Sequence, residues 1–379
     1  MPSSTSTSKG KRRLPRLFFA APSEIVPRDY ERPIPQLPWR RLTLIVVLIV
    51  FAAAATWEIY VRSIGYAPTL NDTDDLWVQA RRRVKPESLV IIGDSRPLFD
   101  LDLDELEKGL GNRPVQLALA GCCAYPILAD LANDELFHGT IICSIVPAIF
   151  FTPGGPDLEI AEKTVSRRRK QTPAQRLSHH LGMLLEEHIA FLKQEDLTLD
   201  ILLKQLPISN RAHAQVPPTF PPYFQTVDRE RRTRMTEQCA RPGSPLAKRI
   251  QQIWLPLFTP PPPPTYVPKE TFLRGMGEKI EARFRDTRTA VEKLRARGGK
   301  IVFVRFPLNG ELKALEDRLN PRAREWAQLL KDTKAPGIHF EDYPELASFT
   351  CPEWSHLSAG DSVEFSKRLV PHLRAALGM

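Results

Sequence analysis

The sequence predicts an α/β domain in which helices cover both faces of a five-stranded parallel sheet. Five short apolar runs recur along the chain, at 88–93, 115–121, 140–146, 301–306 and 338–342. Patterns with helical spacing lie between them, at 102–110, 125–137, 270–297 and 321–331. Strands that are apolar throughout, and that alternate with helices, are typical of a parallel sheet buried on both faces.

A long apolar stretch lies near the N-terminus, at residues 42–61. It contains one charged residue, Glu58, close to its far end. At about 1.5 Å per residue, this stretch spans the roughly 30 Å hydrocarbon core of a bilayer. Trp39 precedes it, and Trp57 and Tyr60 lie at its far end, where aromatic rings favour the membrane interface. The sequence therefore predicts one transmembrane helix at 42–61.

The formal net charge is +9, and most of it lies before the apolar stretch. Residues 1–41 hold nine basic and three acidic side chains, which accounts for +6. The rest of the chain is close to balanced, apart from two short basic runs at 167–170 and 229–234. This distribution argues against a nucleic-acid-binding protein, which would carry its basic stripe on a folded face. Residues 1–41 are rich in Ser, Pro and Arg and are predicted to be a disordered tail.

The charges that flank the apolar stretch predict its orientation. Arg40 and Arg41 directly precede it, whereas Asp72, Asp74 and Asp75 follow it. Because basic residues favour the cytoplasmic side, the tail is expected to stay in the cytoplasm and the bulk of the chain to be exported. In a bacterium, this describes a single-pass protein of the inner membrane with a periplasmic domain.

The exported part is predicted to have three regions. A linker at 62–86 leads to an α/β domain made of 87–156 and 270–379. An insertion at 157–269 interrupts this domain, with a helix at 173–206 followed by a Pro-rich, basic stretch. Insertions of this kind lie on the surface, often near loops that carry function. The sequence leaves three interpretations of the insertion open: a lid over the site, a surface that binds a partner, or an addition that only packs against the domain.

The pattern of metal-binding residue types predicts no metal or cofactor site. The five cysteines, at 122, 123, 143, 239 and 351, match no zinc spacing, and an odd number leaves at least one free thiol. A buried apolar role is expected for Cys143, while a disulfide at Cys122 or Cys123 is permitted in an exported domain. His179, His180 and His188 lack a fourth ligand and are expected on a solvated helix face.

A candidate nucleophile follows the first predicted strand, in the run Gly93-Asp94-Ser95-Arg96. Open α/β sheets gather their sites at the carboxyl ends of their strands, where Ser95 would lie. A serine hydroxyl is a weak nucleophile until a base accepts its proton. The sequence must therefore supply that base elsewhere.

The base is found near the C-terminus, in the run CPEWSHLSAGD at 351–361. His356 lies just before a predicted helix, and Ser358 with Asp361 makes a capping box for that helix. Histidine suits proton transfer because its pKa lies near neutrality. Glu353, three residues earlier, can bind the other ring nitrogen and set the tautomer.

These blocks carry a resemblance to the SGNH (GDSL-like) hydrolase superfamily, over roughly 86–156 and 270–379. The resemblance implies a flavodoxin-like three-layer sandwich with Ser95 as nucleophile, His356 as base and Glu353 as the orienting acid. It also implies an oxyanion hole formed by the backbone N–H groups of Ser95 and Gly121, the glycine of LALAGC.

The chain departs from the family pattern in two places. The acid is usually aspartate and is glutamate here. The third block is usually a Gly-x-Asn-Asp after the third strand, whereas this chain has Phe150-Phe151-Thr152-Pro153-Gly154-Gly155, without asparagine. Asn133-Asp134 falls inside a predicted helix and is not assigned to this block. The departure means that another group completes the oxyanion hole or that the chemistry is weakened.

One further residue is expected at the same sheet edge. Arg305 ends the fourth predicted strand, as Ser95 follows the first. Its guanidinium would bind an anionic substrate or pair with a carboxylate, and the sequence leaves both interpretations open.

Two functions of different class follow from these observations. The first is a membrane-anchored esterase or O-acyltransferase that acts on an acyl ester of the cell envelope through an acyl-Ser95 intermediate. The resemblance extends to anchored envelope proteins that modify O-acetyl groups of exported polysaccharides, and a transferase would need a polytopic partner to supply the acyl donor. The second is a catalytically weak or inactive SGNH scaffold that serves as a glycan-binding or envelope-assembly module, with 157–269 as its contact surface.

Overall fold

The computed structural model describes residues 37–204, 224–260 and 262–379. The chain divides into two compact units, residues 1–53 and 54–379. Of the predicted tail at 1–41, residues 1–36 lie outside the described residues, as does the Pro-rich stretch at 217–222. Residues 39–41 belong to a helix instead of the tail.

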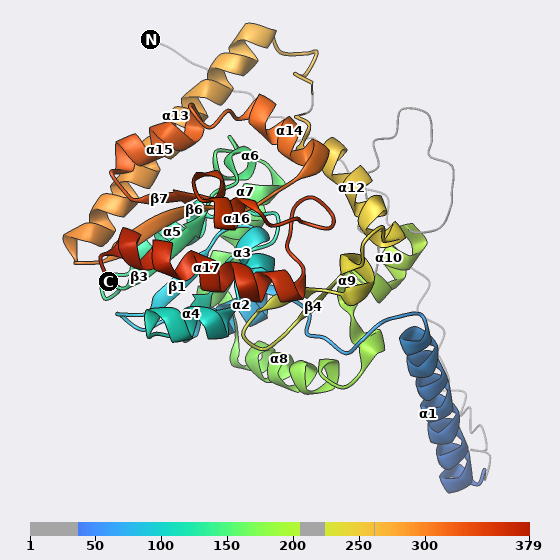
Figure 1. The fold of residues 1–379 in the computed structure, drawn as a ribbon. Coiled ribbons are helices and arrows are strands. Elements are labelled where there is room, and N and C mark those ends of the chain that lie inside the picture. The colour runs from blue at the N-terminus through green and yellow to red at the C-terminus, as the bar shows by residue number, and fades with distance from the viewer. Residues whose placement is uncertain (1–36, 205–223, 261) are drawn as a thin grey trace, which may run out of the picture. The chain divides into compact units, whose positions relative to one another are not determined.

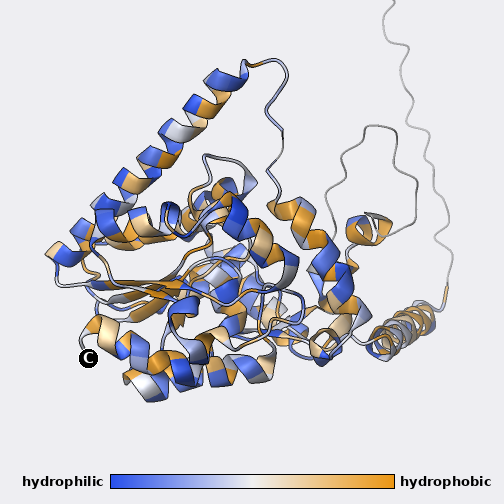
Figure 2. Cartoon of the chain, turned by 45° about the horizontal axis from the view of Figure 1, so that its top comes forward, coloured by the Kyte–Doolittle hydropathy of each residue, from blue (hydrophilic) through white to orange (hydrophobic). Residues whose placement is uncertain are grey.

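The apolar stretch near the N-terminus forms helix α1 (Trp39–Ser63), which is long and apolar enough to cross a membrane. All side chains from residue 39 to residue 53 are exposed. Figure 2 shows this helix mostly in the colour of hydrophobic residues. A helix of this length and composition is suited to cross a membrane.

The larger unit is built on a five-stranded parallel sheet, as predicted. Its strands are ordered β2-β1-β3-β6-β7. Their bounds are β1 Leu89–Ile92, β2 Val115–Gln116, β3 Thr140–Ser144, β6 Lys300–Arg305 and β7 Gly337–His339. The chain runs from β1 outward to β2 and then crosses to β3 on the other side of β1. The carboxyl ends of β1 and β3 therefore enclose a topological switch point, where open α/β sheets place their ligand sites.

Helices cover both faces of this sheet (Figure 1). Alternate strand residues enter opposite cores: Leu89 and Ile91 join one, and Val90 and Ile92 join the other. The first core contains α3 (Arg96–Asp100), α4 (Leu103–Leu110), α14 (Gly310–Leu319) and α17 (Ala359–Leu377). The second contains α2 (Asp74–Arg82), α5 (Tyr125–Ala132), α7 (Pro156–Lys170), α13 (Lys269–Ala296) and α15 (Glu325–Thr333). Shorter elements are α6 (Pro147–Phe150), η2 (Phe340–Asp342) and α16 (Pro344–Ala347).

The segment 62–86 is not a linker, which corrects the prediction. It contains α2, whose Trp77 is fully buried and donates its indole N–H to the Leu117 carbonyl at 2.9 Å. The helix signals were present in the sequence, because Thr73 caps the N-terminus and acidic residues occupy the first turn. The α/β domain therefore begins well before residue 87.

The insertion is built of short elements rather than one long helix. They are α8 (Pro173–Glu186), η1 (Ala190–Leu192), α9 (Gln194–Leu197), α10 (Leu199–Lys204), the antiparallel hairpin β4 (Gln225–Val227) and β5 (Thr233–Met235), α11 (Glu237–Ala240) and α12 (Pro245–Phe258). Ile250 and Trp254 of α12 join the core that packs on β1 and α17. The insertion is therefore part of the hydrophobic core and not only a surface addition.

All five cysteines are free and buried. The disulfide considered for Cys122 or Cys123 is not formed; the two thiols donate instead to the carbonyls of Ala120 and Phe150, at 3.4 and 3.3 Å. His179 accepts or donates one hydrogen bond with Gln79 at 2.9 Å and serves to dock α8 on α2.

Replacing Trp77 by alanine tests the extent of the domain. Loss of a fully buried indole should lower the free energy of unfolding by about 3–5 kcal/mol, measured by urea denaturation of the full chain in detergent. The same substitution at the exposed Trp39 is the matched control. A stability for Trp77→Ala within about 0.5 kcal/mol of wild type would mean that 62–86 is a linker after all.

Candidate active site

The end of strand β1 brings Ser95 to the switch point. Gly93 turns the chain there with φ of +154°, and a Cβ on it would lie 2.5 Å from Ser144 Cβ of the neighbouring strand. Only glycine fits this position. The turn places Ser95 at the start of α3, with its side chain half-buried at the edge of the sheet.

His356 lies against this serine, although the two residues are 261 positions apart. His356 Nε2 is 2.8 Å from Ser95 Oγ, within hydrogen-bond distance. His356 is 1% exposed, so its ring is held by packing rather than by solvent. The structure thus brings the predicted nucleophile and the predicted base together.

Glu353 binds the other side of the imidazole. Its Oε1 is 2.8 Å from His356 Nδ1 and also accepts the His356 backbone N–H at 2.6 Å. With Nδ1–H donating to the carboxylate, Nε2 is left as the acceptor that faces Ser95. The three predicted residues therefore form one continuous chain of hydrogen bonds.

Trp254 of the insertion belongs to the candidate site, although the sequence did not identify it. Its indole N–H donates to Glu353 Oε2 and lies 2.7 Å from the Glu353 carbonyl oxygen. Glu353 is fully buried, so each of its oxygens needs a donor. The insertion therefore holds the acid that orients the base.

Aromatic rings enclose the imidazole. The ring centroids of Phe99, Trp254 and Phe224 lie 4.3, 5.6 and 5.9 Å from that of His356. Phe99 comes from α3, while the other two come from the insertion. These rings exclude water from the chain of hydrogen bonds and limit the motion of His356.

Asp100 fixes the backbone that follows His356. Its Oδ1 accepts the Leu357 N–H at 2.8 Å. Burial raises the pKa of Asp100 well above its usual range, which favours the neutral carboxylic acid. A neutral acid here adds no second negative charge beside Glu353.

A buried cluster of charged side chains holds the residue that follows Ser95. Glu316 of α14 pairs with both Arg96, the residue after Ser95, and Arg305 of β6. Burial opposes ionisation of Glu316, but the two guanidinium groups lower its pKa to about 2. Asp94 accepts the Ser144 hydroxyl at 3.1 Å and so joins β1 to β3 at the same level.

Arg305, for which the sequence left open either substrate binding or pairing with a carboxylate, is buried and paired. Arg305 is 5% exposed, its Nη2 bonds to Glu316 at 2.5 Å, and its Nη1 donates to the Ile145 carbonyl at 3.1 Å. Of the two interpretations, pairing with a carboxylate is the one that the structure bears out. Burial favours that pairing, because an unpaired guanidinium inside the domain would be costly.

The predicted oxyanion donors face the same cleft as the serine. Gly121, with φ of +65°, and Ser95 both line it. Within the described part of the chain, neither backbone N–H has a hydrogen-bond acceptor. The N–H of Leu119 donates to the Gly93 carbonyl at 3.0 Å, which ties the Gly121 loop to the strand that carries Ser95.

Cys122, next to this loop, does not compete as a nucleophile. Burial raises the pKa of Cys122 to about 12, so its thiol stays protonated at neutral pH.

The cleft extends well beyond the serine, with a volume of about 1470 Å³. The segment 151–155, which lacks the family's asparagine, forms part of its wall. Asn320, at the C-terminus of α14, also lines it, a position that no sequence pattern singled out. Most of the other lining side chains are apolar, and they include Phe99, Ile149, Phe151, Phe224, Leu257, Phe258, Phe272, Met276 and Ile280.

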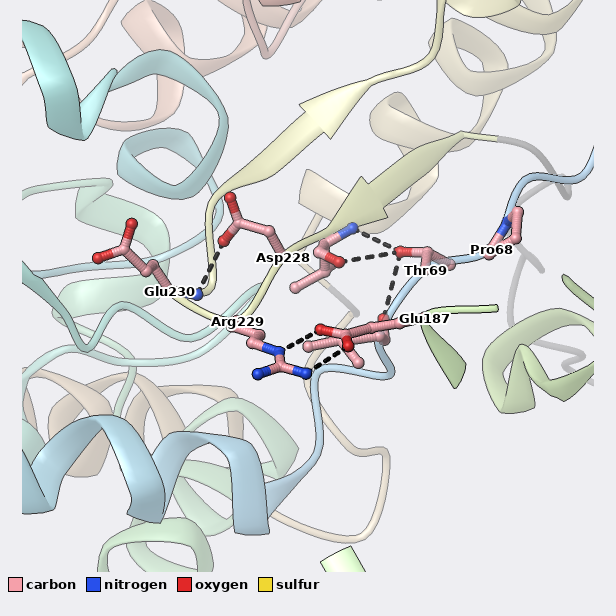
Figure 3. A pocket seen from close by; sticks show the side chains of 8 residues that line it. Pro68, Thr69, Glu187, Asp228, Arg229 and Glu230 are labelled. Carbon is pink, nitrogen blue, oxygen red and sulfur yellow. Dashed lines mark hydrogen bonds and ion pairs between the residues drawn. The ribbon is translucent and has the colours of Figure 1, made fainter. Parts of the chain in front are cut away.

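A second, shallower hollow of about 330 Å³ lies apart from this site (Figure 3). Its charged groups satisfy one another, since Arg229 pairs with Glu187 and the Glu230 N–H donates to Asp228 at 2.9 Å. Thr69 bonds to the backbone of Val227 through its hydroxyl. This hollow joins α8, the β4–β5 hairpin and the segment after α1, and it presents no nucleophile beside a base.

Comparisons with known proteins identify no family for this chain. Neither a scan against models of protein families nor a search of curated proteins gives a match to this chain.

Replacing Glu316 by glutamine tests the buried ion cluster. Loss of its charge deprives two buried guanidinium groups of the carboxylate that they share, which should lower the free energy of unfolding at pH 7 by about 3–5 kcal/mol. Glu316 has a lowered pKa in the folded state, so its contribution is present above pH 4.5, its ordinary pKa, and is lost as pH falls toward 2.

Urea unfolding of wild type and Glu316→Gln between pH 7 and 2.5 measures this dependence. The stability difference should shrink below pH 4.5, while the exposed Glu311→Gln on the same helix should differ little from wild type throughout. A difference that is independent of pH would contradict the ionised cluster.

Proposed function

We propose that this chain is a membrane-anchored serine esterase or O-acyltransferase of the SGNH type that acts on an acyl ester of the cell envelope. The observation that carries the proposal is the hydrogen-bond chain from Ser95 Oγ through His356 to Glu353, with 2.8 Å at each of its two steps. Such a chain turns a serine hydroxyl into a nucleophile.

The reaction has two half-steps. In the first, Ser95 Oγ attacks the ester carbonyl carbon while its proton passes to His356 Nε2, and the carbonyl oxygen becomes an oxyanion beside the Ser95 and Gly121 N–H groups. The C–O bond to the alcohol then breaks, and the departing oxygen takes the proton from His356. The acyl group is left on Ser95.

The second half-step decides between hydrolysis and transfer. His356 takes a proton from an incoming hydroxyl as its oxygen attacks the acyl carbon. The bond between the acyl carbon and Ser95 Oγ then breaks, and His356 gives the proton to Ser95 Oγ, which restores the free serine. Water gives hydrolysis, whereas a sugar hydroxyl gives transfer. The cleft is large enough to hold an acceptor beside the acyl group, and acetylated polysaccharide is the substrate class that the resemblance favours.

The strand order supports the same assignment. The order β2-β1-β3-β6-β7 is the one expected of a flavodoxin-like sandwich, in which ligands bind at the switch point beside the first strand. Ser95 lies at that place. Helix α1 and the basic tail support anchoring in the inner membrane, with the N-terminus in the cytoplasm and the catalytic domain in the periplasm. A transferase would receive its acyl donor from a polytopic partner.

Labelling of the full chain with a fluorophosphonate probe tests whether the serine is activated. Wild type should label, Ser95→Ala should not, and His356→Ala should label about 10²–10⁴-fold more slowly because the base is gone. Ser348→Ala, at an exposed serine, is the matched control and should label like wild type. A folded wild type that does not label would favour a non-catalytic scaffold.

A second variant tests the orienting role of the acid. Glu353→Gln keeps the shape of the side chain but changes its hydrogen bonds to the imidazole, so the tautomer with Nε2 free is no longer favoured. Hydrolysis of a p-nitrophenyl ester should slow by about 10²–10⁴-fold in kcat with little change in KM. An unchanged kcat would show that Glu353 has only a structural role.

A further inference from the structure

Helix α8 presents leucines on the side that faces away from the domain. Leu177, Leu181, Leu184 and Leu185 are each more than half exposed, at 62%, 54%, 52% and 54%. Their spacing places them on one face of the helix. A helix face that points to water normally carries charged side chains, so this pattern is the reverse of the usual one. We call these four residues the leucine face.

The opposite side of α8 is already occupied. Met183 is buried with Leu70, Leu76 and Val227, and His179 is hydrogen-bonded to Gln79 of α2. The leucine face therefore cannot turn inward without breaking packing that the domain already has.

Polar contacts at the C-terminal end of α8 fix it further. Glu187 pairs with Arg229 of the hairpin loop (Figure 3), and Glu186 Oε2 accepts the Asn71 N–H at 2.9 Å. These bonds hold α8 to the segment that follows α1. These contacts therefore fix which side of α8 faces away from the domain.

The same end of α8 is joined to the end of the apolar span. Glu58 accepts the N–H groups of Ala190 and Phe191 at 2.9 and 3.1 Å, and Arg62 donates to the His188 carbonyl at 2.8 Å. These three partners follow α8 within five residues. The leucine face thus begins close to where the chain leaves its predicted membrane helix.

Basic side chains lie beside α8. The pKa of Arg82 is lowered, first by burial and then by the positive charges of Arg176 and Arg168. Arg176 is exposed in the first turn of α8, seven residues before the buried Met183, so it lies on the same side of the helix as Met183 and adds positive charge there. Basic side chains on a helix that also exposes an apolar face favour contact with an anionic membrane surface.

We propose that α8 lies in the membrane that α1 spans, with its leucine face at the boundary between headgroups and acyl chains. This inference rests on the proposed span of α1 but not on the proposed chemistry of Ser95. The occupant is a lipid surface because the contacts of Glu58 and Arg62 hold the helix at the end of an apolar span. An exposed apolar patch of this kind is otherwise rare on a water-soluble domain.

Depth-dependent quenching tests the proposal. Leu181→Cys in the full chain is labelled with the environment-sensitive fluorophore NBD, which is feasible because the native cysteines are all buried. The protein is reconstituted at one copy per nanodisc of phosphatidylcholine and phosphatidylglycerol, with and without doxyl-labelled lipid. Leu185→Cys serves as a second probe of the leucine face, and Gln328→Cys, exposed on α15, is the matched control.

The proposal expects NBD at 181 and 185 to emit at shorter wavelength and to be quenched by doxyl lipid about twofold or more relative to the probe at 328. Equal quenching at all three positions would overturn it. A blue shift at 181 that appears only with two copies per disc, without doxyl quenching, would also overturn it and assign the leucine face to contact between copies.

Discussion

The carboxylate of Glu353 is the group on which the site depends. It is fully buried, and a buried negative charge is costly unless donors surround it. Two donors come from His356, through its backbone N–H and Nδ1, and the third is the indole of Trp254. Satisfying this one charge therefore fixes the tautomer of the imidazole, the path of the loop before α17 and the docking of α12. It also explains why an insertion of more than one hundred residues packs into the core of the domain.

The serine is held by a separate set of constraints. Gly93 allows β1 to turn beside Ser144, and the cluster of Arg96, Glu316 and Arg305 anchors the residue that follows Ser95. One set of contacts thus positions the nucleophile from the sheet, and the other positions the base from the C-terminal loop. The two meet at the switch point between β1 and β3, where the parallel sheet leaves room for a ligand.

The five strands and the Ser95, His356 and Glu353 group could be predicted because their signals are local: apolar runs, a strand-to-helix turn and a three-residue spacing before a capped helix. The sequence could not predict which side chains from distant segments meet when the domain packs. Trp254 lies 99 residues from Glu353, and Arg305 meets Glu316 only once α14 docks on β6. The sequence predicted a helix at 173–206, but which side the leucines of α8 would face depends on how α2 and the hairpin pack against it. Helix α2 was overlooked despite its cap, because its short, polar sequence resembles a linker.

The most direct measurement of the central claim is trapping of the covalent intermediate. Full-length protein is mixed with a p-nitrophenyl ester, quenched in acid within milliseconds to seconds, and its intact mass and peptides are determined. The account predicts one acyl group per chain, on the peptide that contains Ser95, formed at the rate at which p-nitrophenol is first released. Ester turnover with no acylated chain, or acylation at another residue, would contradict a mechanism that passes through acyl-Ser95.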